Sequence, residues 1–108
     1  NTKSLLPYAS ATGLDGIEAI TPQPQGDVSL EEVRKNLSED MFLIDGIAAV
    51  LFNDTYEVER LEEQTRKIID LFAPRLILGI SDEISSNGDI ERIRNVGRIV
   101  DKYNSKVD

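Results

Sequence analysis

The stretch LILGISDEISSNGDIERI, residues 76–93, contains the features that decide the fold. It begins with a continuous apolar run, passes through the adjacent carboxylates Asp82 and Glu83, and ends like the start of a helix. A continuous apolar run of this length is typical of a parallel strand that is covered on both faces. The stretch therefore predicts a strand at 76–80, followed by a loop and a helix that begins near Ile90.

The same order of strand, loop and helix occurs twice more upstream. The short apolar runs GIEAIT, residues 16–21, and MFLI, residues 41–44, predict two further strands. After the first run, Ser29 and Glu32 have the spacing of a capping box, in which each side chain bonds the backbone N–H of the other residue, and they predict a short helix.

A longer helix is predicted over about 55–72, with Asp54 and Glu57 as a second capping box. Its apolar residues are spaced by three, four and seven, as one buried helix face requires, and they are Val58, Leu61, Ile68, Ile69 and Phe72. A helical pattern over 4–12 also precedes the first strand. The order of one helix and then three strand–helix units predicts an α/β fold with a parallel sheet covered by helices.

Composition excludes several classes of function. The 108 residues carry 20 acidic and 12 basic side chains, which gives a net charge of −8, so nucleic acids and anionic membranes are not expected as partners. The chain has no cysteine and no histidine, which excludes disulfides and thiolate metal sites, removes the commonest general base, and favours a cytoplasmic protein. No apolar run is long enough to span a membrane. The first residues after Asn1 already have a structural pattern, so we expect the chain to be a piece of a longer protein.

Candidate functional residues follow from the predicted topology, because sites in parallel α/β folds form at the carboxyl ends of the strands. Asp82 and Glu83 follow the third predicted strand, and Asp45 follows the second. The simpler alternative for Asp82 and Glu83 is that they solvate a loop or help to cap the last helix.

Glu18 is a candidate of another kind, because it lies inside a predicted strand. Burial of an unpaired carboxylate is costly, so Glu18 must face a polar interior or a partner. The sequence leaves two alternatives open: a substrate-facing position, or a structural ion pair with a base such as Arg75 or Lys3.

Three segments together resemble the C-terminal third of the uroporphyrinogen decarboxylase superfamily, which also contains corrinoid-dependent methyltransferases. The segments are TGLDGIEAITPQPQGDVSLEEVRKNL (12–37), MFLIDGI (41–47) and LILGISDEISSNGDIERIRNV (76–96). The resemblance covers about residues 4–103. It implies a TIM (β/α)8 barrel, of which residues 1–108 carry the last three strand–helix units.

The chain departs from the family pattern at two loops. After the last strand, the decarboxylases carry a glycine-flanked histidine and the zinc methyltransferases carry a cysteine ligand, and Asp82 occupies this position here. After the preceding strand, the family phrase Gly-Asn-Leu/Ile-Asp-Pro is replaced by DGIAA, residues 45–49. Asp82 keeps an oxygen that could bind a metal, since zinc accepts carboxylate ligands.

The resemblance implies a parent enzyme that is a lyase of porphyrin biosynthesis or a methyltransferase. Its substrate would be a tetrapyrrole, a corrinoid or a related small molecule, and zinc or a corrinoid would be the cofactor. Asp82, Glu83 and Asp45 would be catalytic, Glu18 would bind substrate, and Asp82 would be the metal ligand. The alternative is a non-catalytic α/β module for binding or oligomerisation. On either reading we expect the chain alone to form homo-oligomers, because three strands leave open sheet edges.

Overall fold

The computed structural model describes residues 3–18 and 20–106. Over these ranges the chain forms four α-helices and a three-stranded sheet. The elements in chain order are η1 (Lys3–Leu5), α1 (Leu6–Ser10), β1 (Gly16–Glu18), α2 (Leu30–Asn36), β2 (Phe42–Ile47), η2 (Ala49–Phe52), α3 (Val58–Phe72), β3 (Leu76–Ile80) and α4 (Ile90–Lys106), where η marks a 3-10 helix.

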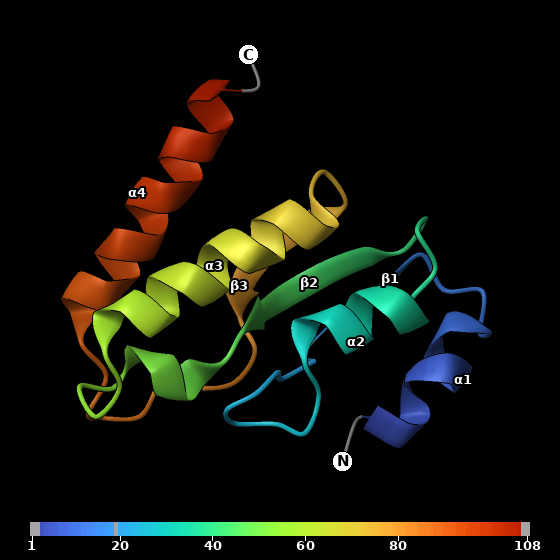
Figure 1. The fold of residues 1–108 in the computed structure, drawn as a ribbon, viewed down its shortest axis with the longest axis horizontal. Helices are drawn as coiled ribbons and strands as arrows, with labels where there is room; N and C mark the ends of the chain where they lie inside the picture. The colour runs from blue at the N-terminus through green and yellow to red at the C-terminus, as the bar shows by residue number, and fades with distance from the viewer. Residues whose placement is uncertain (1–2, 19, 107–108) are drawn as a thin grey trace.

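The sheet has the order β1-β2-β3, and both pairs of neighbouring strands are parallel (Figure 1). The register places Glu18 beside Ile44, and Ile44 beside Ile77. The predicted α/β class and the parallel sheet in chain order are confirmed. The described sheet is open and not a closed barrel, because β1 and β3 form its two edges.

Two strand boundaries differ from the prediction, whereas β3 has the predicted bounds. β1 ends at Glu18, and Ala19 of the predicted strand 16–21 lies outside the described residues. β2 extends to Ile47, so Asp45 and Gly46 lie within the strand and do not close it. The sheet bond between the Ser81 N–H and the Ile47 carbonyl, at 2.8 Å, extends the pairing at this end.

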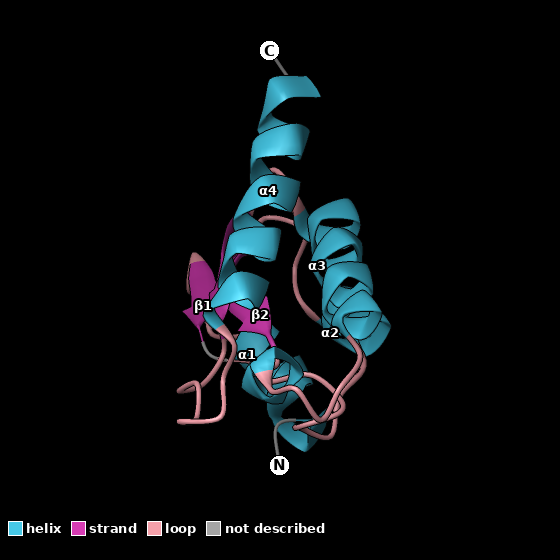
Figure 2. Ribbon diagram, turned by 90° about the vertical axis from the view of Figure 1, so that its left-hand side faces the viewer, coloured by secondary structure: helices cyan, strands magenta, loops and turns pink. Residues whose placement is uncertain are grey.

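One face of the sheet packs against helices. Figure 2 shows α2 and α3 together on one side of the strands. Leu43 and Ile47 of β2 and Leu61 and Ile68 of α3 are all fully buried in the core between these layers. The apolar periodicity of α3 predicted this face correctly, because a helix covering a sheet needs one continuous apolar stripe.

The other face bears side chains that neither α2 nor α3 covers. We call it the open face and define it by Gly16, Glu18, Phe42, Ile44 and Ile77, which alternate with the core-facing residues of their strands. Ile77 is 58% exposed and Phe42 is 37% exposed. In the described chain, helices therefore cover one face of the parallel sheet. A continuous apolar run indicates a strand that can be buried. It does not show that both faces of the sheet are covered.

The helix termini confirm one predicted capping box and exclude the other. The Ser29 side chain accepts a hydrogen bond from the Glu32 N–H, and the Glu32 carboxylate accepts one from the Ser29 N–H, both at 3.1 Å. The predicted box of Asp54 and Glu57 is absent, since α3 has Glu57 at its N-cap with no side-chain cap bond. Tyr56 instead continues a turn from Asn53, so the helix begins later than predicted.

The last helix, α4, packs only partly against the rest of the chain. Val96 contacts the core, but Ile90 and Ile93 are 62% and 43% exposed. α4 is attached at its start by Arg92, whose buried guanidinium donates a hydrogen bond of 3.0 Å to the Leu51 carbonyl in η2. Among residues 3–18 and 20–106, no helix is long and apolar enough to cross a membrane.

Candidate functional site at the carboxyl ends of the strands

The carboxyl ends of the three strands, with the loops that follow them, form one edge of the sheet, which we call the carboxyl rim. Ser81 connects separate segments there: its hydroxyl accepts from the Gly46 N–H and donates to the Ile20 carbonyl, each at 2.9 Å. The side chain is buried, so both bonds are shielded from water. Ser81, directly after β3, thus links Gly46 in β2 to Ile20 in the loop that precedes α2. Sequence reasoning missed it, because its partners lie 35 and 61 residues away.

Asp82 lies on the rim but turns toward the loop between β1 and α2. Its Oδ2 accepts a 2.9 Å hydrogen bond from the Gln25 side chain, and its Oδ1 accepts a 2.8 Å bond from the Glu83 N–H. The Gln25 Oε1 in turn accepts from the Val50 N–H at 3.1 Å. Gln25 therefore links Asp82 to the segment after β2. Asp82 and Glu83 are both exposed.

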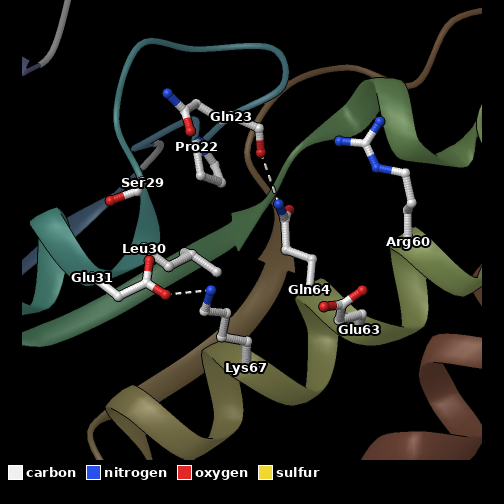
Figure 3. A pocket seen from close by; sticks show the side chains of 9 residues that line it. All are labelled: Pro22, Gln23, Ser29, Leu30, Glu31, Arg60, Glu63, Gln64 and Lys67. Carbon is white, nitrogen blue, oxygen red and sulfur yellow. Dashed lines mark hydrogen bonds and ion pairs between the residues drawn. The ribbon is translucent and has the colours of Figure 1, made fainter.

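Gln64 of α3 supports the rim from the helix side. Its Oε1 accepts from the Ala48 N–H at 2.9 Å, and its Nε2 donates to the Gln23 carbonyl at 2.8 Å (Figure 3). Both polar ends of one side chain thus satisfy backbone groups of two different loops. Sequence reasoning missed this residue too, because a glutamine on a charged helix face normally indicates solvent exposure.

Asp45 is directed to the open face by an unusual backbone conformation. Its φ is +78°, in the left-handed region that L-residues rarely adopt, and Gly46 follows with a φ of +106°. A Cβ atom placed on Gly79 would lie 2.7 Å from the Asp45 Oδ1. Gly79 shares the face of Ile77 and not that of Leu78, which packs on the core. The Asp45 carboxylate therefore lies over Gly79 on the open face.

Glu18 lies on the same face, one strand away. Its exposed side chain is in register with Ile44, the residue before Asp45. The two bases proposed as structural partners pair elsewhere: Lys3 with Glu32 at 3.0 Å, and Arg75 with Asp40 at 3.9 Å. Within the described residues, Glu18 therefore forms an ion pair with neither of these two bases.

The four predicted carboxylates fall into two groups. Glu18 and Asp45 lie on the open face of neighbouring strands, and Asp82 and Glu83 lie on the loop beyond β3. Within residues 3–18 and 20–106, no three His, Cys, Asp or Glu side chains form a group that could hold a metal ion. A zinc site needs four ligands, or three with an open position. The described donor set does not fit zinc, and Asp82 alone could supply no more than one ligand.

A separate cavity of about 290 Å³ lies between the loop before α2 and the exposed side of α3. Figure 3 shows Glu31 and Lys67 paired across it, with Arg60 and Glu63 nearer the start of α3. None of the predicted site residues lines this cavity. Its charged groups are exposed and largely compensate one another, so it is a groove between two helices and not an enclosed site.

The described residues form an α/β domain with an open, three-stranded parallel sheet, and the buried side chain of Ser81 cross-links its carboxyl rim. Comparison with known proteins adds no closer assignment: no family model matches the chain, and no curated protein or solved structure is significantly similar to it.

Proposed function

We propose that the chain is the C-terminal part of a uroporphyrinogen decarboxylase-like (β/α)8 barrel. The parent enzyme is a lyase or a methyl-transferring enzyme that acts on a tetrapyrrole, a corrinoid or a related small molecule. The observation that carries the proposal is the pair of carboxylates, Glu18 and Asp45, on the face of the sheet without helices. In a barrel this face lines the interior, and the adjoining carboxyl rim carries the active site.

The backbone at Asp45 supports the same proposal. A non-glycine residue with positive φ inside a strand costs free energy, and such residues concentrate at functional sites. Gly79 is matched to it, since a side chain there would displace the carboxylate. Asp45 thus presents its carboxylate on the same face as the apolar side chains of Ile44 and Ile77. This arrangement suits a ligand with an apolar body and N–H donors.

Asp82 and Glu83 complete the proposed site from the rim. Asp82 is oriented by Gln25, so its carboxylate is held at the start of the loop after β3. This is the position where the superfamily carries its histidine or cysteine. Asp82 can accept a proton or a hydrogen bond from substrate, and Glu83 supplies a second exposed carboxylate beside it.

The experiment is an equilibrium titration of the chain, at submicromolar concentration, with uroporphyrin and separately with hydroxocobalamin. We expect a saturable absorption change with at least one of them, and several-fold weaker binding in Asp45→Asn and Asp82→Asn. Asp101→Asn on the exposed side of α4 is the control and should bind as the wild type does. Failure of both ligands to bind, or equal binding by all variants, would exclude this assignment.

A second candidate is the non-catalytic α/β module. The observation in its favour is the absence, within the described residues, of any group of three or more potential metal ligands, together with the exposed Ile77 and Phe42. The ligand titration separates the two candidates, because a module without a site binds neither ligand.

A further inference from the structure

The open face has the composition of an interface. Phe42, Ile44 and Ile77 form its apolar centre, and Ile77 is more than half exposed. Gly16 lies beside them without a side chain, and a Cβ there would lie 3.2 Å from the Phe42 carbonyl oxygen and 3.4 Å from the Phe42 Cβ. Exposed apolar side chains gathered on one face of a small domain mark interaction surfaces.

Opposite charges occupy two diagonal corners of this face. Glu18 lies at the carboxyl end of β1, and Arg75 lies just before β3, at the amino end. The Arg75 guanidinium lies over the Phe42 ring, 5.8 Å from its centroid, which puts it on the open face. Its ion pair with Asp40 is 3.9 Å long and exposed, so it contributes little and can be exchanged for another partner.

We propose that the open face is a two-fold symmetric interface between two copies of this chain. The six positions form a grid of three strands and two rows, with Gly16, Phe42 and Arg75 in one row and Glu18, Ile44 and Ile77 in the other. A two-fold axis in the plane of contact can exchange the corners held by Glu18 and Arg75. Each Glu18 then meets Arg75 of the second copy, twice per dimer.

The same axis matches the other positions of this grid. It also brings the Asp45 carboxylate, which lies over Gly79 beyond the grid, near its counterpart on the second copy, and this contact between like charges opposes association. With strands about 4.8 Å apart and a rise of about 3.3 Å per residue, Phe42 falls over Gly16 of the second copy, and Ile44 falls beside Ile77. The largest side chain thus meets the position that has no side chain, and the apolar residues meet each other. The strands of the two copies cross at roughly 70°, between the aligned and orthogonal classes of sheet packing.

A second copy is favoured over another partner because the six grid positions are complementary to themselves in charge and in side-chain size. The net charge of −8 on each copy opposes association. We therefore expect a weak dimer whose dissociation can be followed at micromolar concentrations. The proposal does not depend on the proposed function, since it concerns the 108-residue chain itself.

Sedimentation equilibrium over a wide range of concentrations tests it. At high concentration the wild type should have twice the 12.0 kDa mass of the monomer. Glu18→Arg and Arg75→Glu should each weaken association by at least about tenfold, and the double variant should recover most of the loss. Recovery of association in the double variant cannot arise from destabilisation of the fold. Circular dichroism checks that each variant is folded.

Two matched controls locate the interface. Glu39→Arg makes the same charge change as Glu18→Arg at another exposed site, and Ile93→Asp matches Ile77→Asp on α4. Neither control should reduce association. A wild type that stays monomeric overturns the proposal and leaves the face to a different partner. A dimer that survives Ile77→Asp, or charge variants that do not rescue each other, overturns this arrangement.

Discussion

Asp45 and Gly79 form a matched pair at the residue scale. The left-handed conformation of Asp45 carries its carboxylate onto the open face, and the missing side chain of Gly79 leaves room for it. Neither the left-handed conformation of Asp45 nor the absent side chain of Gly79 adds packing to the hydrophobic core. The pair therefore holds one carboxylate in a defined place at some cost in free energy of unfolding.

We expect Asp45→Gly to be more stable than Asp45→Ala by about 1 kcal/mol, because glycine adopts a positive φ without steric cost. Asp70, on the exposed side of α3, provides the control. In a right-handed helix the order reverses, and Asp70→Ala should be more stable than Asp70→Gly by about 1 kcal/mol. Urea unfolding of the four variants measures both differences. The same order at both sites would contradict the positive φ of Asp45.

Ser81 gives a second prediction at this scale. Ser81→Ala removes the acceptor of the buried Gly46 N–H and the donor to Ile20, so it should lower the free energy of unfolding by about 1–3 kcal/mol. Ser86→Ala, in the exposed turn of the same loop, should change it by less than about 0.5 kcal/mol. Thermal unfolding of both variants measures the two changes. A larger loss for Ser81→Ala shows that Ser81 links the strand ends, whereas equal losses would show that it behaves like any loop serine.

At the scale of elements, α2 depends on charge at its first turn. The Lys3 ammonium, followed by the Ser29 N–H, lowers the pKa of Glu32 from its ordinary value of 4.5. A lowered folded-state pKa contributes stability above the unfolded value, and this is lost as the pH falls through the folded value. The pH window therefore begins near 4.5 and extends below it.

Glu32→Gln tests this contribution, because glutamine keeps the acceptor of the capping box and removes the charge. The variant should be less stable than the wild type at pH 7, and the difference should shrink as the pH falls below about 4.5. Glu39→Gln, on the exposed loop before β2, serves as the matched charge change. A difference that persists unchanged at pH 3 would show that the charge on Glu32 has no part in it.

The sequence predicted the elements that local patterns encode. The stripe of α3, the Ser29–Glu32 box and the bounds of β3 depend on residues less than a few turns apart, and the structure confirms them. The bridges from Gln25 to Asp82 and from Ser81 to Ile20 span 57 and 61 residues, so no local pattern contains them. Local patterns do not encode the open face either, since covering a face depends on which elements return to it.

For the whole molecule, the proposed barrel origin predicts a chain without activity. An active site of this class is assembled from the rims of many strands, and the described chain supplies three. The purified chain should show no decarboxylation of uroporphyrinogen and no methyl transfer from methylcobalamin to a thiol. Active members of the superfamily serve as positive controls. Turnover that disappears in Asp82→Ala would show that three strands suffice for chemistry.

The two polar ends of Gln64 have a mechanical consequence. One side chain holds the backbone at Gln23 and at Ala48, so two loops that are separate in sequence share a single attachment on α3. A rotation of α3 about its axis would displace both loops in the same direction. A movement of either loop alone must first break its hydrogen bond to Gln64. We therefore expect these two loops of the rim to move together with α3 and not independently of each other.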